Sequence, residues 1–154
     1  MGGLCLHAFA GDARSPNIQD SRPKVSLTAS QAVERIRLIE YLVPKSGERQ
    51  TDPHAAAIIA SGRQAAPWLL EKLLDDTKSR YFYEFQYKIG DIAHALLREI
   101  YHTDPSQSLM ARNPPLRPEE GYTYRDYVAL VSSTRGRQEL QAAWEKVVRS
   151  TGQK

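Results

Sequence analysis

The chain has 154 residues, of which 41% are hydrophobic and 25% charged, and 21 Lys and Arg against 18 Asp and Glu give a formal net charge of +3. These values are typical of one globular domain and exclude wholesale disorder and fibrous repeats. No apolar run reaches the ~18–20 residues that cross a bilayer, so no membrane insertion is expected. The single cysteine, Cys5, excludes an internal disulfide and a multi-cysteine zinc site.

Residues 1–27 form a predicted leader. Ala8-Phe9-Ala10 has the small-residue pattern that signal peptidase requires, although the apolar stretch before it is short and no Lys or Arg precedes it. The polar segment that follows contains Pro16 and Pro23, which is typical of a flexible chain. We expect one of two arrangements. Either the first ten residues are a residual signal sequence of a periplasmic or secreted protein, or they are an irregular N-terminus of a cytoplasmic one.

Three helices are predicted in the first half of the chain. Thr28 and Gln31 form a capping box, and apolar residues at three-and-four spacing follow it as far as Val43. Asp52-Pro53 starts a second helix, which Gly62 closes in the left-handed conformation. A third helix begins around 64–67, with its proline in the first turn, and extends to about residue 74.

Three more helices are predicted in the second half of the chain, at Ile89–Tyr101, Tyr124–Ser133 and Arg137–Ser150. Four prolines preclude a continuous helix over 102–122, and the one candidate strand is Tyr81–Tyr87. The predicted fold is all-α: a compact bundle of five to six helices over residues 28–150, with a tail at 151–154. The predicted core contains eight apolar side chains: Ile36, Ile59, Leu70, Leu73, Ile92, Leu96, Trp144 and Val147. On the helix after Tyr124, Tyr127, Val128 and Val131 are expected to point inward.

The segment from Ala55 to Ile100 has a short helix that ends at Gly62, then a Gly-x-x-Ala-x-Pro-x-Leu-Leu-x-x-Leu-x-Asp pattern, then an Ala- and Leu-rich helix. It resembles a HEAT-like helical repeat, over about a third of the chain. The resemblance implies a pair of antiparallel helices within a binding scaffold and carries no catalytic residue. Stable solenoids need about three repeats, and about one and a half are present.

Asp91, His94 and His102 are the candidate residues for a metal-binding or enzymatic site. Their spacings of three and eight could place them on one helix face, as an Asp-x-x-His pair with a further ligand two turns on. The structural alternative is that Asp91 caps its helix and His94 lies where two helices meet. No Gly-rich phosphate loop, nucleophile elbow or other cofactor motif is present, so no cofactor is predicted.

The most unusual segment holds five of the thirteen aromatic residues within seven positions: Tyr81, Phe82, Tyr83, Phe85 and Tyr87. Such side chains are frequent anchors of protein interfaces, and beside basic residues they can stack on nucleic-acid bases. In an extended segment Phe82 stands opposite the other four, so these four rings could instead pack inward. We predict a protein partner at this segment and keep internal packing as the alternative.

The excess of positive charge lies in residues 112–154, where 8 basic groups face 5 acidic ones. Arg135, Arg137 and Arg149 are interleaved with Glu139 and Glu145, which favours a solvated, salt-bridged face over a phosphate-binding patch. The sequence therefore favours a non-enzymatic helical protein-binding module, of which an exported inhibitor or immunity-type protein is one instance. The alternatives are a small enzyme or metal-binding protein that uses the Asp91 group, or a weak nucleic-acid binder. The oligomeric state stays open.

Overall fold

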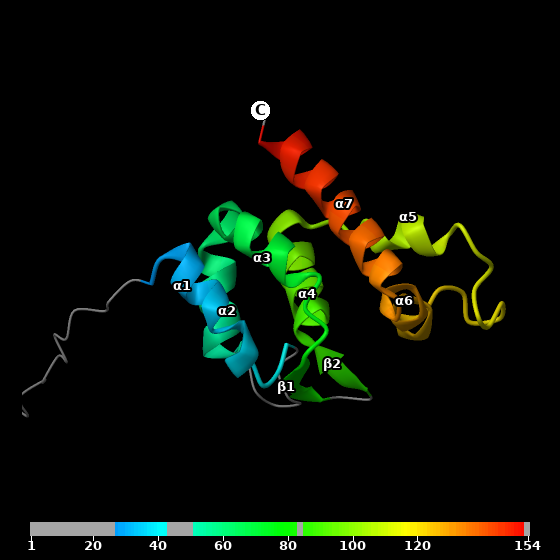
Figure 1. Cartoon of the computed structure of the whole chain (residues 1–154), viewed down its shortest axis with the longest axis horizontal. Helices are drawn as coiled ribbons and strands as arrows, with labels where there is room; N and C mark the ends of the chain where they lie inside the picture. The colour runs from blue at the N-terminus through cyan, green and yellow to red at the C-terminus, as the bar shows by residue number, and fades with distance from the viewer. Residues whose placement is uncertain (1–26, 43–50, 83–84, 153–154) are drawn as a thin grey trace, which may run out of the picture.

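The computed structural model describes residues 27–42, 51–82 and 85–152, and this part of the chain is mainly helical (Figure 1). The predicted helical class is thereby confirmed, and a two-stranded sheet is added to it. Apart from Leu27, the predicted leader lies outside the described residues. In chain order the elements are α1 (Ala29–Glu34), the 3₁₀ helix η1 (Ile36–Leu38), α2 (Pro53–Ala60), the 3₁₀ helix η2 (Gly62–Ala65), α3 (Ala66–Lys72), β1 (Lys78–Phe82), β2 (Gln86–Lys88), α4 (Ile89–Tyr101), α5 (Ser106–Met110), α6 (Tyr124–Val131) and α7 (Thr134–Thr151).

The predicted helix starts at Thr28 and Asp52 are confirmed by their capping contacts, whereas the last helix starts at Thr134, three residues before the predicted Arg137. The Thr28 hydroxyl accepts a hydrogen bond from the Gln31 N–H at 3.2 Å, and the Gln31 amide oxygen accepts one from the Thr28 N–H at 3.0 Å. Asp52 caps α2 and also accepts a hydrogen bond from the Glu40 N–H at 3.0 Å. The helix that was predicted to reach Val43 is shorter: α1 ends at Glu34, η1 ends at Leu38, and the backbone is extended at Ile39. Gly62 has the predicted left-handed φ, at +55°.

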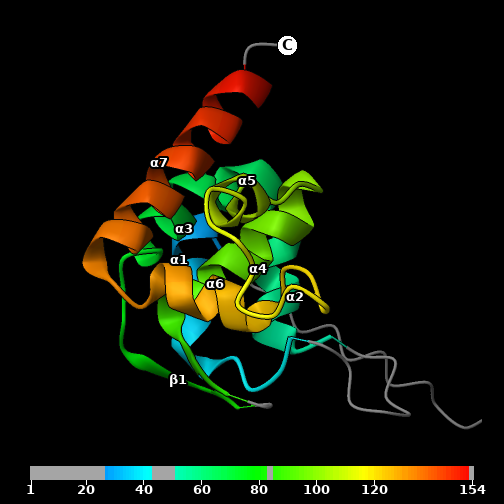
Figure 2. The same ribbon diagram turned by 90° about the vertical axis from the view of Figure 1, so that its right-hand side faces the viewer.

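Helix α4 lies at the centre of the fold and keeps its predicted bounds. It contacts α2, α3, β2 and both 3₁₀ helices. In Figure 1, α1 to α3 lie on one side of it and α5 to α7 on the other. Helix α7 contacts α3, α5 and α6, and Figure 2 shows its C-terminal half extending beyond the other helices. The fold therefore has two groups of helices that meet along α4.

Most of the predicted core is buried. Ile36, Leu73, Ile92, Leu96 and Trp144 are at most 2% exposed, whereas Ile59, Leu70 and Val147 are half-buried against them. The expectation that Val128 points inward is wrong, because its side chain is 37% exposed. Helix α6 turns Tyr127 and Val131, one helical turn apart, toward the core, so Val128 faces away.

The candidate strand over 81–87 is part of a β-hairpin. Strands β1 and β2 are antiparallel, with Lys78 opposite Lys88 and Phe82 opposite Gln86. Three residues of β1 thus lie opposite a single residue of β2 between these two pairs, and side chains complete the pairing at this irregularity. The Ser79 hydroxyl donates to the Tyr87 carbonyl at 2.9 Å, and the Gln86 amide donates to the Ser79 carbonyl at 3.0 Å.

The proline-rich segment over 102–122 contains one short helix, α5, and otherwise follows an irregular course. This helix is the reason why seven α-helices occur in the described residues, where five or six were predicted. The Asp126 carboxylate holds the end of the segment, since it accepts hydrogen bonds from the Leu116 N–H at 2.7 Å and the Thr123 N–H at 2.8 Å. The segment is thereby fastened to the N-terminus of α6.

We predict that Gly90→Ala destabilises the fold by about 1–3 kcal/mol, the usual cost of overpacking. A Cβ at Gly90 would lie 2.5 Å from Arg137 Nη1 and 2.5 Å from the Leu73 carbonyl oxygen. Gly152→Ala is the matched control, because the nearest atom to its Cβ would be 3.6 Å away. Urea unfolding measures both variants. A Gly90→Ala protein as stable as the Gly152→Ala protein would contradict the packing described for α4.

Candidate functional site

A row of stacked and tilted rings connects the hairpin to the centre of the fold. The ring centroids of Tyr81 and Tyr87 are 4.5 Å apart, and those of Tyr87 and Tyr124 are 5.1 Å apart. The row continues from Tyr124 to Tyr127 at 5.6 Å and from Tyr127 to His94 at 4.9 Å. Aromatic pairs of this kind each contribute about 0.5–1.5 kcal/mol beyond the area they bury. The ring row, as we call these five residues, therefore fastens the hairpin to α4 and α6.

A buried ion pair lies beside the ring row. Asp91 Oδ1 accepts hydrogen bonds from Arg137 Nη2 and from the Tyr127 hydroxyl, both at 3.2 Å. Its other oxygen accepts one from the Lys88 N–H at 2.9 Å, which caps α4. Arg137 also donates to the Leu73 carbonyl at 3.3 Å. Asp91 and Arg137 are 6% and 5% exposed, so this one pair joins α4, α6, α7 and the end of α3.

The tyrosines next to this carboxylate are held in their neutral form. Burial, and then the negative charge of Asp91, raise the pKa of Tyr127 well above its ordinary value. Burial also raises the pKa of Tyr124, to which Asp91 and the Tyr87 hydroxyl add further increases. These phenols consequently act as neutral hydrogen-bonding groups and not as phenolates.

His94 is fixed between two partners. The Trp144 indole N–H donates to its Nδ1 at 2.9 Å, so the neutral ring carries its proton on Nε2. That nitrogen lies 3.5 Å from Asp104 Oδ1. Burial lowers the pKa of His94 to about 4; the Asp104 carboxylate acts in the opposite direction, and Arg98 lowers it further. His94 is therefore a neutral structural residue that joins α4 to α7.

A cavity of about 340 Å³ lies against the ring row. The hairpin contributes Tyr81 and Tyr87 to its wall, α6 contributes Tyr124 and Tyr127, and α4 contributes Asp91 along with His94 and Arg98. The segment from residue 104 to Met110 closes another side. The cavity thus lies at the junction of four elements, where tyrosine rings and a few charged groups share one wall.

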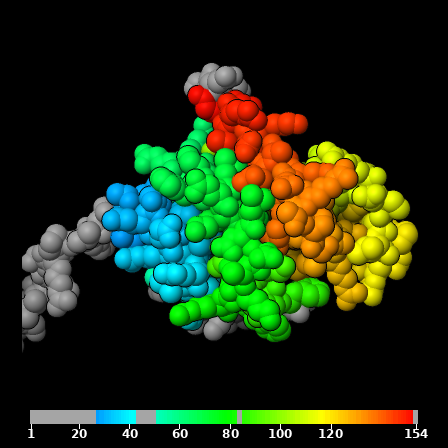
Figure 3. Space-filling model, in the orientation of Figure 1, coloured from blue at the N-terminus to red at the C-terminus, as the bar shows by residue number. Residues whose placement is uncertain are grey.

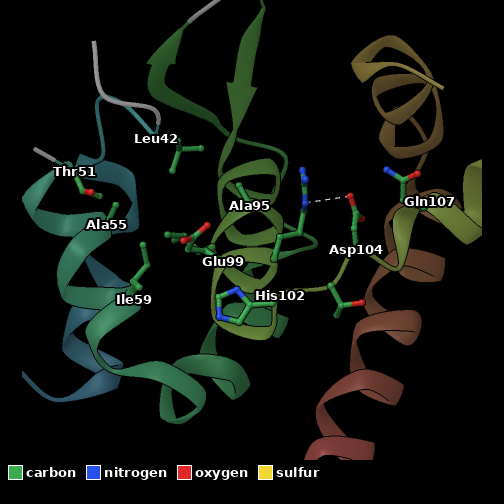
Figure 4. A pocket seen from close by; sticks show the side chains of 12 residues that line it. Leu42, Thr51, Ala55, Ile59, Ala95, Glu99, His102, Asp104 and Gln107 are labelled. Atoms are coloured by element: carbon green, nitrogen blue, oxygen red, sulfur yellow. Dashed lines mark ion pairs between the residues drawn. The ribbon is translucent and has the colours of Figure 1, made fainter. Parts of the chain in front are cut away.

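A larger and more open pocket, of about 820 Å³, adjoins this cavity and shares the Arg98–Asp104 ion pair with it. Figure 4 shows Ala55 and Ile59 of α2 on one side, with Glu99 and His102 at α4 on the other. Leu42 and Thr51 border residues 43–50, which lie outside the described part of the chain. Leu42 also lines the smaller cavity, so both pockets border this segment.

The structure gives the predicted partner-binding residues different surroundings. Tyr81 is buried, and its ring contacts Tyr87. Phe85 and Tyr87 are half-buried, and both rings contact Tyr124. Phe82 is 65% exposed. Tyr83 lies outside the described residues.

Asp91, His94 and His102 do not form a shared site. Asp91 is bonded to Arg137, and both ring nitrogens of His94 face protein groups. His102 is exposed and ends α4 in a left-handed conformation with φ 52°, so its side chain leaves the helical face. In the described part of the chain, no group of three or more His, Cys, Asp or Glu side chains could hold a metal ion. The structural alternative for Asp91 and His94 is confirmed.

The expectation of a solvated face on the last helix is wrong for Arg137. It points into the core toward Asp91, whereas Arg135 lies 3.0 Å and Arg149 3.8 Å from a glutamate one turn away, as predicted. The amphipathic pattern of the helix identifies Trp144 as a core residue. No local signal identifies the partners of Arg137 and Trp144, which lie 46 and 50 residues earlier in the chain.

No protein-family model, curated protein sequence or solved structure matches this chain. Within the described residues, every helix is too short or too polar to span a bilayer.

We predict that the protein loses about 3 kcal/mol of stability through His94 as the pH falls from 6.5 to about 4. The unfolded chain takes up this proton near pH 6.5, whereas the folded chain does so only near pH 4. Acidification from pH 6.5 to about 4 therefore favours unfolding, and the neutral His94 ring contributes its full stabilisation above pH 6.5. Urea unfolding as a function of pH measures the loss.

His94→Gln is expected to flatten this part of the pH profile, whatever its effect on stability at neutral pH. His102→Gln is the matched control because His102 is exposed. An equal slope in the wild-type and His94→Gln proteins would contradict the assignment of the acid sensitivity to His94.

Proposed function

We propose that this chain is a non-enzymatic, mainly helical protein-binding module whose contact surface is the outer face of the hairpin, centred on Phe82. The observation that carries the proposal is the 65% exposure of this ring, on a strand whose neighbouring tyrosine is buried. Large aromatic side chains are the most frequent anchors of protein interfaces. An exported inhibitor or immunity-type protein is one instance of such a module.

The outer face of β1 combines cationic side chains with one aromatic ring. Lys78, Arg80 and Phe82 alternate with the inward-facing Ser79 and Tyr81, and all three are exposed. The paired strand adds the half-buried Lys88, directly opposite Lys78. The described part of this face thus carries three cationic side chains and one exposed apolar ring, and one of the cations, Arg80, lies 3.8 Å from Glu40. The matching partner is an acidic protein surface with an apolar pocket.

The inner side of the hairpin is held in place by its packing on the rest of the fold. Tyr81 and Tyr87 connect it to the ring row, and the Ser79 and Gln86 side chains complete its irregular pairing. A surface that is ordered before binding loses less conformational entropy when the partner docks. In Figure 3 the hairpin forms the lower edge of the molecule, between the N-terminal helices and α7.

Two further points favour binding over catalysis. His94 uses both ring nitrogens and Asp91 uses both carboxylate oxygens in contacts within the protein, so these groups act as structural links. The resemblance of residues 55–100 to a HEAT-like helix pair is also in keeping with a binding scaffold.

A photo-crosslinking experiment tests the proposal. The photoreactive residue benzoylphenylalanine replaces Phe82 in one protein and Leu116 in the other, in cells that produce the chain. Leu116 is the matched control because it is 63% exposed and lies in a different segment. We expect a discrete protein adduct at position 82 and none of that size at position 116. The same adducts at both positions, or an adduct that nuclease removes, would overturn the proposal.

The variants Phe82→Ala and Tyr81→Ala separate binding from folding. We expect that added wild-type protein competes with the photoreactive protein for the crosslinked partner, and that added Phe82→Ala protein does not. The melting temperature of the Phe82→Ala protein should stay unchanged. Tyr81→Ala removes a buried ring and is expected to cost about 3–5 kcal/mol. If Phe82→Ala unfolds the protein as readily as Tyr81→Ala, Phe82 belongs to the packing of the hairpin and the proposed surface is wrong.

A further inference from the structure

Helix α7 is fastened unevenly along its length. Its first half is bonded to α4 through Arg137 and Asp91, and its buried residues end at Trp144. In the second half, residues 144–151, the apolar side chains of Val147 and Val148 are half-buried. Figure 2 shows this second half extending beyond the other helices. Trp144, which is fully buried, is therefore the last point at which the core encloses α7.

The hydrogen bond between Trp144 and His94 requires a neutral histidine. The indole N–H can only donate, and it donates to His94 Nδ1 at 2.9 Å. A protonated imidazole carries an N–H on both nitrogens and has no acceptor to offer. A half-turn of the ring sets a C–H against the indole and restores no acceptor. Uptake of a proton by His94 therefore breaks this bond and leaves two N–H groups facing each other.

The charged groups around His94 are paired with one another. Arg98 of α4 is paired with Asp104, whose Oδ1 lies 3.5 Å from His94 Nε2. On the side of α6 and α7, Tyr127 and Arg137 both donate to Asp91. The other titratable groups of the same cavity wall are phenols: Tyr81, Tyr87, Tyr122 and Tyr124. Burial lowers the pKa of His94 to about 4, against the opposing effect of Asp104, so the folded chain takes up this proton only in acid.

The proton changes one side of His94 and leaves the other intact. The Nε2–H keeps Asp104 as its acceptor in both states, and the positive charge strengthens that contact. Trp144, in contrast, becomes a buried donor without its acceptor, which is costly unless the indole reaches water. Beyond Trp144, the exposed Arg63 donates to the Thr151 carbonyl at 3.0 Å, and water competes for such a contact. Protonation therefore acts against the second half of α7.

We propose that the Trp144–His94 hydrogen bond is a proton-sensitive switch for the second half of α7. When His94 takes up a proton, residues 144–151 leave α4, and the first half of the helix stays bonded through Arg137 and Asp91. The opening exposes the rings of Trp144 and Tyr101, whose centroids lie 6.1 Å apart in the closed form. This switch does not depend on the hairpin surface proposed above.

The test follows the ¹⁵N-labelled full chain by NMR while the pH is lowered through the titration of His94. We expect the Trp144 indole N–H to lose its protection from exchange with water at the midpoint measured for the His94 ring. The amides of Leu140 and Ile92 should stay protected, because the first half of α7 and α4 remain packed. Trp68 is the internal control: its side chain is already 41% exposed, so its indole signal should not follow His94.

Two results would overturn the proposal. In one, the Trp144 indole stays protected after His94 has been protonated. In the other, Leu140 and Ile92 lose their protection together with Trp144, which is global unfolding and not the opening of one helix end.

The variant His94→Gln separates the switch from the general effects of acid. The glutamine carbonyl oxygen can accept from Trp144 and does not titrate, so the opening should be absent over the same pH interval. His102→Gln is the matched control, because His102 is exposed, and it should open as the wild type does. Opening of the His94→Gln protein at the wild-type midpoint would contradict the switch. If His94→Gln does not fold, the comparison of the Trp144 and His94 midpoints in the wild type decides.

Discussion

The buried ion pair between Asp91 and Arg137 is the contact on which the rest of the fold depends. One carboxylate completes the N-terminal cap of α4, receives the Tyr127 hydroxyl and balances the guanidinium of α7. Desolvating two charges is costly, and the cost is offset only where the geometry and the additional hydrogen bonds are good. Here the Leu73 carbonyl takes a further guanidinium N–H, and Gly90 leaves room for Arg137. The pair specifies how α7 lies across α3 and α4.

The ring row extends this fixed centre outward to the hairpin. Tyr127 is bonded to Asp91, stacks on His94 and lies next to Tyr124, which in turn holds Tyr87 of β2. A two-stranded hairpin is marginally stable on its own, so this packing is what keeps it in place. The same row forms a wall of the cavity, so the hairpin and the cavity lie close together.

Local features of the fold could be predicted from the sequence, and distant partners could not. The caps at Thr28, Asp52 and Gly62 depend on residues within one turn, and each formed as predicted. Arg137 has the spacing of a solvated helix residue, and only the folded chain brings it to Asp91. The spacing of Asp91, His94 and His102 suggested a shared face, but it assumed a helix that continues through His102, where α4 ends.

The aromatic segment likewise has a local feature that could be predicted and distant contacts that could not. Alternation along an extended strand correctly sets Phe82 apart from Tyr81, because that pattern is local. The packing of Tyr87 and Phe85 on Tyr124, more than 35 residues later, has no local signature. The sequence therefore indicated where a surface anchor could lie, whereas the cavity behind it came only from the structure.

A double-mutant cycle between Asp91→Asn and Arg137→Met tests the central claim most directly. Free energies of unfolding would be measured in urea for the wild type, the two single variants and the double variant. Each single variant is predicted to lose about 3–5 kcal/mol, because it leaves one buried charge without its partner. The double variant should lose far less than the sum of the two. Losses that add to within about 0.5 kcal/mol would show that the two residues act independently, and would contradict this account.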